Sequence, residues 1–518
     1  MHEPVLLVGG LAVALALAIL SKRFELPYPI TFLVAGTALA FVPGIPPVHI
    51  APDWIFLTVL PPLLFSAGWS TDWTIFRENI AAIVQLAIGL VIATTLAVAA
   101  VAHWIRPELG VAGAFVLGAI VSPPDAVAAA ASFERFAVPR RIRGIIEGEA
   151  LVNDATALVI YGYAVAVGVT AFSLRGAAWS FVLVAIGGII IGLAVSWVVE
   201  ALSRALARYE LNDTLIDNLL LIGTPYLAYL SAQALHVSGV LAVVIAGIAL
   251  SRRSTLVYGP QTRLVAYNVW TLWIYVLNAY VFLAIGLQLR TFVAQGSRLL
   301  DVLPAALLIS AVVIVIRFAW VYPASWLTHY VRSLRACDPG VPASWLTVIS
   351  WSGMRGIVSL AAALALPAGF NQRQIIVFIT FVVIFITLVG QGLTLNPLLR
   401  ALRVEEESNE AQHEIEIRTR ALEAGLARID ELQAHPSDQH EAEDLAQLRH
   451  EYETRIVHLR AGGKAASVLA DLTHDYAERE ALRAERYAVM RLRDAGEIPD
   501  DTFRRIQYDL DLAESRLS

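Results

Sequence analysis

Three carboxylic acids lie close together in a largely apolar stretch of the chain, at Glu147, Glu149 and Asp154, and Asn153 directly precedes the last of them. Ionisable groups at membrane depth are costly, so a functional role is the default hypothesis for them. A helix advances 100° per residue, which puts Glu149 and Asn153 on one face and Glu147 and Asp154 on another. The stretch therefore offers two polar faces that can do different work.

The chemistry that fits these groups is the exchange of a proton for a cation. Desolvation disfavours the charged form of a buried carboxylate, so such a group takes up either a proton or a desolvated monovalent cation. We assign this role to Asp154, with a transient sodium ion held by Asp154 and Asp125. Asn153 and Ser122 are further candidate ligands, since hard cations prefer oxygen.

Structural roles compete with these assignments. Asp125 could instead cap a helix, and Asp154 could instead pair with an arginine. For Glu149 the structural role is favoured: a lone buried charge is prohibitive, so we expect it to pair with Arg355. Arg317, also in an apolar segment, could pair or extend toward the membrane surface, and a structural role is favoured for it as well.

Composition indicates a membrane protein. Of the 518 residues, 57% are hydrophobic and 16% charged, whereas globular chains average about 25% charged. The single cysteine, Cys337, excludes an intrachain disulfide framework and a multi-cysteine metal site. Basic residues outnumber acidic ones up to residue 400, and the reverse holds for 401–518. We therefore predict a transmembrane domain over 1–400 and a soluble helical tail over 401–518.

Apolar runs long enough to cross a bilayer recur along the first 400 residues. They predict about thirteen membrane segments, and a count of twelve is the alternative because the eighth and ninth nearly touch. The segments are 4–20, 28–43, 54–68, 79–104, 110–133, 147–169, 178–203, 214–235, 237–251, 267–288, 302–326, 344–367 and 374–399. With thirteen, most loop arginines lie on one side, and the positive-inside rule puts that side and the tail in the cytoplasm of a plasma membrane.

Two of these segments are interrupted in mid-span. One contains Ser-Pro-Pro-Asp at 122–125 and the other Trp-Ser-Gly-Met-Arg-Gly at 351–356. Consecutive prolines remove backbone donors, and paired glycines flank a charge in the second. The two lie seven segments apart, so they cross the bilayer in opposite directions. Interrupted helices in inverted, corresponding positions are the best sequence pointer to the binding site of a secondary transporter.

The tail shows helical periodicity. Ile415, Leu422 and Ile429 recur every seven residues, and a second apolar seam runs from Leu445 to Leu459 at steps of three and four. This spacing is typical of a short coiled coil or helical pair. Glycine-containing stretches at 462–463 and 496–501 separate two further helices.

Six stretches of the chain resemble the sodium/proton exchanger family, which includes NhaP-type bacterial antiporters and the animal sodium/hydrogen exchangers. The three signature stretches are SPPDAV (122–127), EGEALVND (147–154) and GMRGIVSL (353–360). LPPLLF (60–65), HVSGVLA (236–242) and YVFLAIGLQL (280–289) follow the family order as well.

The resemblance implies an all-α polytopic membrane protein with inverted repeats and two broken, crossing helices, the NhaA-like antiporter fold. It also implies a homodimer whose mobile core moves in an elevator-type mechanism, electroneutral exchange at the Asn153–Asp154 pair, and a Glu149–Arg355 ion pair. Ser66 and Ala150 stand where many members carry an acid and a serine. Both positions belong to the cation's neighbourhood in some relatives, so these two departures leave open whether sodium or potassium is preferred. Ser66, Glu147 and Arg317 are accessory candidates for the site.

We therefore expect a secondary transporter, and no enzyme, that exchanges Na+, or K+ or Li+, for H+. The alternatives are a membrane-anchored ion or pH sensor that signals through the tail, and an uncoupled cation channel. An intramembrane enzyme is disfavoured because no nucleophile–base pair or metal-ligand cluster lies within the segments. We expect no cofactor and no nucleic acid as partner. The tail is a candidate site for a regulatory partner or ligand.

Overall fold

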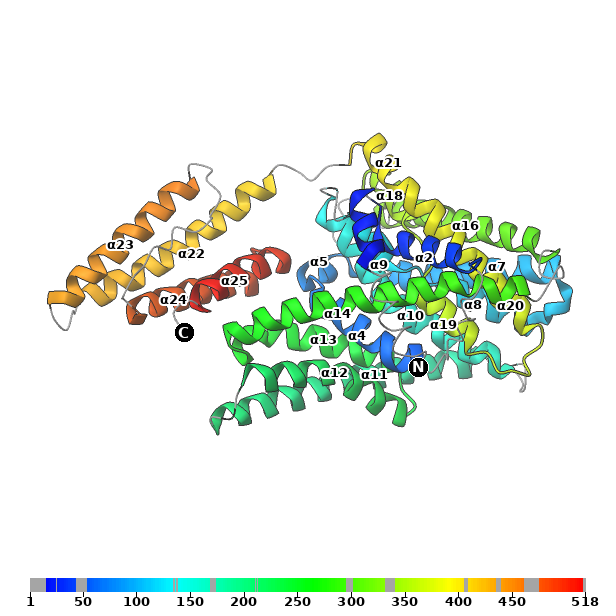
Figure 1. Ribbon diagram of the computed structural model, residues 1–518, viewed down its shortest axis with the longest axis horizontal. Coiled ribbons are helices and arrows are strands. Elements are labelled where there is room, and N and C mark those ends of the chain that lie inside the picture. Colours follow the sequence, from blue (N-terminus) through cyan, green and yellow to red (C-terminus); the bar gives the residue numbers. More distant parts are fainter. Residues whose placement is uncertain are drawn as a thin grey trace.

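The computed structural model describes most of the chain as packed helices, with the tail at one end of a bundle (Figure 1). The described residues are 15–24, 26–42, 54–133, 136, 138–167, 174–209, 211, 213–294, 301–330, 341–404, 409–434, 439–460 and 475–515. Within these ranges every regular element is a helix. The all-α fold class predicted from composition is confirmed for this part of the chain.

A first group of helices packs around α13 and α14. The hydrophobic core of this group includes Phe65, Val243 and Trp270, which are all buried. The members are α2 (Tyr28–Leu39), η1 (Ile55–Val59), α4 (Leu60–Ser70), α11 (Leu174–Arg208), α12 (Thr214–Ala234), α13 (Gly239–Val257) and α14 (Pro260–Leu287), which α15 (Leu289–Ala294) follows.

A second group of helices packs around α8, α10 and α16. Its first half comprises α5 (Trp73–Glu78), α6 (Ile80–Val84), η2 (Gln85–Leu90), α7 (Val91–Ile105), η3 (Pro107–Leu109), α8 (Gly110–Val121), α9 (Ala126–Phe133) and α10 (Arg140–Val167). Its second half comprises α16 (Leu303–Tyr330), α18 (Ala343–Trp351), α19 (Ile357–Leu364), α20 (Arg373–Phe385), η5 (Ile386–Gln391) and α21 (Gly392–Leu402). The two groups meet along α10, which also contacts α4 and α13.

Eight helical stretches in the described residues are long and apolar enough to cross a membrane. Their exposed surface carries large apolar side chains such as Trp197, Leu219 and Val315, as expected of a surface that faces lipid. Two shorter apolar helices, Tyr28–Leu39 and Ile55–Ser70, add to them. The first predicted segment, 4–20, lies mostly outside the described residues, so the count of thirteen stays a prediction.

The eighth and ninth predicted segments form two separate helices. α12 ends at Ala234 and α13 begins at Gly239. Between them His236 adopts a positive φ of 55°, and the Ser238 side chain accepts a hydrogen bond from Leu241 N at 3.2 Å, which caps α13. The alternative of one merged segment is therefore wrong at this point.

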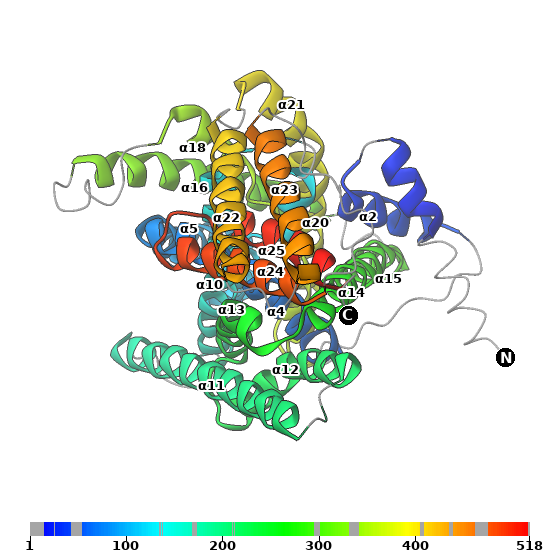
Figure 2. The same cartoon turned by 90° about the vertical axis from the view of Figure 1, so that its left-hand side faces the viewer.

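Four helices follow the membrane bundle: α22 (Asn409–Gln433), α23 (Gln439–Arg460), α24 (Asp475–Asp494) and α25 (Asp500–Ser515). The predicted apolar seams meet, because Leu422 and Ile429 share a buried cluster with Leu445 and Tyr452. Gly496, with φ of 76°, ends the turn after α24. In the view of Figure 2 these helices lie in front of the membrane bundle, and α25 contacts α14. The domain boundary at 400/401 stays a prediction.

Candidate ion-binding site

The two interrupted segments meet at their breaks. α8 ends at Val121 and α9 begins at Ala126, while α18 ends at Trp351 and α19 begins at Ile357. Asp125 N donates to Met354 O at 2.6 Å, so one break satisfies the backbone of the other. A Cβ placed on Gly356 would overlap the carboxylate of Asp125. Only glycine at position 356 lets the two interrupted segments approach each other this closely.

Arg355 holds the crossing together through backbone carbonyls. Its Nε donates to Val121 O at 2.9 Å and its Nη2 to Ser122 O at 3.3 Å, while Nη1 donates to Gly353 O. The carbonyls at the carboxyl end of α8 carry partial negative charge. The guanidinium of Arg355 therefore neutralises the free end of α8.

Glu149 is paired with Arg317, and the predicted pairing of Glu149 with Arg355 is wrong. Arg317 Nη1 and Nη2 donate to the two carboxylate oxygens of Glu149 at 2.6 Å each, and its Nε donates to Ile349 O at 3.0 Å. Both side chains are 1% exposed. The physical reason is that α16 brings Arg317 to this face of α10, whereas Arg355 is taken up by the carbonyls of the break.

The two polar faces of α10 separate as predicted. Glu149 and Asn153 are fully buried within the protein, and Asn153 Nδ2 donates to Pro124 O at 3.1 Å. Glu147 and Asp154 instead line a cavity. α10 begins at Arg140, several residues before the predicted segment at 147, because the helix includes a basic first turn after Pro139. The acids therefore lie in the middle of the helix.

The cavity that Asp154 lines has a volume of about 410 Å³ and lies between the two helix groups. Asp154, Asp125, Ser66 and Glu147 are the predicted site residues that it brings together. Ser122 is not among its lining residues, and the Ser122 hydroxyl donates to Ala119 O at 2.9 Å. Asn153 is not among the lining residues either, but it donates a hydrogen bond to Pro124, which is.

Several buried oxygen atoms at this cavity accept no hydrogen bond within the part of the chain that the structure describes. They are Asp125 Oδ2, Asn278 Oδ1 and Ser359 Oγ, all on lining residues. An unpaired buried oxygen costs free energy, so these atoms call for a partner. A desolvated alkali cation, which takes oxygen ligands, is such a partner.

Sequence analysis missed Asn278 and Ser359. Asn278 is fully buried and within hydrogen-bond reach of the Tyr28 hydroxyl at 3.5 Å. The sequence signal for it is an amide at the middle of the apolar segment 267–288, whose two other amides, Asn268 and Gln288, lie at its ends. Ser359 lies inside the stretch 353–360 that carries the family resemblance, and only the fold puts it in the lining of the same cavity as Asp125.

Crossed broken helices around a buried acidic cavity define this protein as a polytopic membrane transporter. Residues 10–401 match the family model described as "Sodium/hydrogen exchanger, transmembrane". The chain belongs to the sodium/hydrogen exchanger family, whose members are secondary transporters and not enzymes.

Full-length relatives support this membership. An uncharacterized Na+/H+ exchanger of Mycobacterium tuberculosis is 34% identical over 99% of this chain and 97% of its own length. An uncharacterized Na+/H+ exchanger of Escherichia coli K12 is 31% identical over 95% and 94%. A sodium, potassium, lithium and rubidium/H+ antiporter of Bacillus subtilis is 30% identical over 97% and 76%.

A solved structure shares the fold. The sodium proton antiporter MjNhaP1 of Methanocaldococcus jannaschii superposes with a TM-score of 0.56 at 17% identity, over 76% of this chain and 96% of its own. At this identity the likeness shows the fold alone. It confirms the antiporter-type helix arrangement expected from the interrupted segments.

Proposed function

We propose that the protein exchanges Na+, or K+ or Li+, for H+ across the plasma membrane, with Asp154 carrying cation and proton alternately. The observation that carries this proposal is the set of unpaired oxygens beside Asp154 in one cavity. A bound cation satisfies these oxygens, and a proton neutralises Asp154 when the cation leaves. Relatives named as sodium/proton antiporters support the cation class.

The proposed stoichiometry is one cation for one proton, because a single carboxylate carries both. Asp125 contributes Oδ2 as an oxygen ligand. Its Oδ1 accepts a hydrogen bond from Val127 N at 2.9 Å. Asn153 positions the broken segment through Pro124. The Glu149–Arg317 pair and Arg355 are assigned to support of the core and not to ion binding.

The proposed movement is elevator-type, with the second helix group sliding against the first in a homodimer. The cavity between the two groups is the proposed path by which ions reach Asp154. The tail and the arginine-rich loops are proposed to face the cytoplasm. Tail residues contact Arg140 and Arg263, which lie between predicted membrane segments on the side that the positive-inside rule puts inside.

Flux through proteoliposomes with a pH-sensitive dye tests the proposal. Wild type should acidify or alkalinise the lumen when a Na+ gradient is imposed, at a rate independent of a membrane potential clamped with valinomycin. Asp154→Asn should fold normally and abolish this flux. Retained exchange in Asp154→Asn overturns the assignment.

The same assay separates the other two functions. A channel would give cation flux that does not couple to a proton gradient. A sensor would give no flux from pure protein and would lose its function when residues after Arg403 are deleted. Comparing Na+, Li+ and K+ over a range of pH then identifies the cation.

A further inference from the structure

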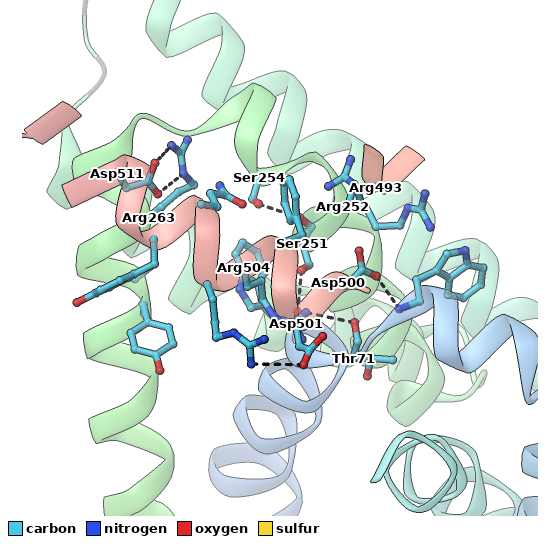
Figure 3. Close-up of a pocket in the computed structure, with 18 of the residues that line it drawn as sticks. Thr71, Ser251, Arg252, Ser254, Arg263, Arg493, Asp500, Asp501, Arg504 and Asp511 are labelled. Atoms are coloured by element: carbon cyan, nitrogen blue, oxygen red, sulfur yellow. Dashed lines mark hydrogen bonds and ion pairs between the residues drawn. The ribbon is translucent and has the colours of Figure 1, made fainter. Parts of the chain in front are cut away.

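A second cavity, separate from the one that Asp154 lines, lies where helix α25 meets the membrane helices. It has a volume of about 570 Å³, which is in the range of pockets that hold small molecules. Its walls come from α4, α13 and α14 of the first helix group and from α22, α24 and α25. Figure 3 shows α25, drawn in pale red, between the green helices of the first group and the pale blue α4–α5 turn.

One wall of this cavity is fixed by a reciprocal capping arrangement. Trp73 N donates to Asp500 Oδ2 at 2.7 Å, and Asp500 N donates to Asp72 Oδ2 at 2.8 Å. Asp72 also caps its own helix, since its Oδ1 accepts from Ile75 N at 3.1 Å. Each carboxylate thus satisfies a backbone donor that a helix start leaves free. The cavity is therefore bounded by matched donors and acceptors at this wall.

Six arginines and four aspartates line the cavity. All four aspartates have partners: Asp500 accepts the Trp73 amide, and the other three form ion pairs. These pairs are Asp501 with Arg140 at 3.1 Å, Asp509 with Arg418 at 2.7 Å, and Asp511 with Arg263 and Arg486 at 2.8 Å each. The negative charge of the lining is thus already matched by groups of the protein.

Two of the lining arginines lack such a match. Among the described residues, neither Arg252 nor Arg504 forms an ion pair with a carboxylate. Arg252 lies over the ring of Trp73, 5.7 Å from its centroid, and Arg504 donates only to Thr71 O, at 3.4 Å. A planar guanidinium donates two parallel hydrogen bonds to a phosphate group, so an arginine without a carboxylate is well suited to bind one.

A third lining arginine, Arg493, adds to this positive charge. Its partner Asp494 is its neighbour in sequence and 58% exposed, and such surface pairs neutralise little. Figure 3 shows Arg252 and Arg493 at one side of the view and the Arg263–Asp511 pair at the other. The surplus positive charge is therefore concentrated in one part of the cavity.

Aromatic side chains supply a different kind of surface in the same cavity. Tyr267 of α14 and Tyr508 of α25 both line it, with ring centroids 5.6 Å apart. Tyr267 is 62% exposed, so part of its ring is available to a ligand. Planar bases stack on such rings.

We propose that this cavity binds a nucleotide. Arg252, Arg504 and Arg493 hold its phosphates, and the base packs against Tyr267 and Tyr508. The site is separate from the ion site, because the two cavities share no lining residue. Nucleotide binding is therefore independent of the proposed function.

Isothermal titration calorimetry of the full-length protein in detergent tests the site. The probes are ADP, which carries both phosphates and a base, pyrophosphate, which has no ring, and adenosine, which has no phosphate. We expect ADP to bind at one site per chain and at least roughly tenfold more tightly than either fragment, because only ADP contacts both surfaces.

Arg252→Gln tests the phosphate contact. It should weaken binding of ADP and of pyrophosphate by roughly tenfold, the effect of losing one hydrogen-bonded contact to a charged group. Arg252 is exposed and takes part in no ion pair among the described residues, so the variant keeps the fold. Arg253→Gln is the matched control: Arg253 is the next residue, pairs with Glu200 at 2.6 Å and does not line the cavity. It should bind both probes as wild type does.

Tyr267→Leu tests the contact with the base. It should weaken ADP binding by roughly tenfold, the effect of losing one stacked base, and leave pyrophosphate binding unchanged. Asp154→Asn should bind ADP like wild type. This variant separates the two proposals, since loss of exchange with retained ADP binding bears only on the ion site.

Three outcomes overturn the nucleotide site. The first is the absence of ADP binding in wild type, or ADP binding that Arg252→Gln leaves unchanged. The second is pyrophosphate binding as tight as that of ADP, which would make this a site for inorganic phosphates. The third is tighter binding of dioctanoyl phosphatidylglycerol than of ADP, with the same dependence on Arg252, which would assign the cavity to a lipid headgroup.

Discussion

Arg317 and Glu149 form a two-pronged ion pair at the centre of the protein, with both nitrogen–oxygen distances at 2.6 Å and both side chains almost fully buried. They lie 168 positions apart in sequence. The pair joins α10, which carries Asp154, to α16. Because the guanidinium also binds Ile349 O next to the second break, one arginine holds three elements of the core.

Removing one partner of this pair should be strongly destabilising. Glu149→Gln or Arg317→Gln leaves an uncompensated buried charge, which costs about 3–5 kcal/mol. Thermal unfolding in detergent, followed by tryptophan fluorescence, should show a large drop in melting temperature for either variant. Glu108→Gln is the control, because its pair with Arg106 is solvent-exposed and contributes at most about 1 kcal/mol. Equal losses for the two pairs would contradict the buried-pair argument.

Gly356→Ala should strongly reduce exchange because it displaces Asp125. The added methyl group would overlap the Asp125 carboxylate, so the two breaks must move apart and the cation ligand with them. We expect exchange to fall by at least tenfold, which corresponds to about 1.4 kcal/mol of misplaced ligand. Gly369→Ala is the control, since nothing lies within 4 Å of a Cβ at that position. Wild-type exchange in Gly356→Ala would show that the breaks are not closely coupled.

Asn278→Ala and Ser359→Ala should weaken cation binding without removing the proton carrier. Each deletes one unpaired oxygen at the cavity, so the cation loses a ligand while Asp154 remains. The apparent Km for Na+ should rise, by roughly tenfold for loss of one ligand interaction of about 1.4 kcal/mol, with the maximal rate retained. Cation dependence of the proteoliposome rate measures this, and an unchanged Km would exclude these oxygens from the ion's coordination.

The contact of α25 with Asp72 should weaken as pH rises. Burial, and then the nearby Asp500 and Asp501, raise the pKa of Asp72 above its usual value of 3.8. Release of α25 exposes Asp72 and returns its pKa toward that value, so the docked state binds the proton more tightly. Protonation therefore favours docking, and the docked state loses stability as pH rises from 3.8 through the raised pKa.

Other charged groups near Asp72 also affect its protonation, so they are considered in the same pH experiment. Those that interact with it are Asp500, Asp501 and Arg504 of α25 and Glu147 of α10. Hydrogen–deuterium exchange over 500–515, normalised at each pH to an unstructured peptide, should show this loss of protection in wild type. In Asp72→Asn the dependence should flatten, and an identical profile in both would place the titrating group elsewhere.

Local sequence determined the elements of the site but not all of their partners. Consecutive prolines at 123–124 and the glycines at 353 and 356 break helices by backbone chemistry alone, so the interruptions were predictable. Helical periodicity likewise put Glu147 and Asp154 on one face of α10. These properties depend only on neighbours within a few residues.

Tertiary structure decided which distant groups meet. Whether Glu149 pairs with Arg317 or with Arg355 depended on where α16 packs. The roles of Asn278 and Ser359 depended on which side chains line one cavity. Asp72 and Asp500 lie 428 positions apart, and nothing in either local stretch specifies the other. Such contacts arise from the packing of whole helices, which a pattern of adjacent residues does not encode.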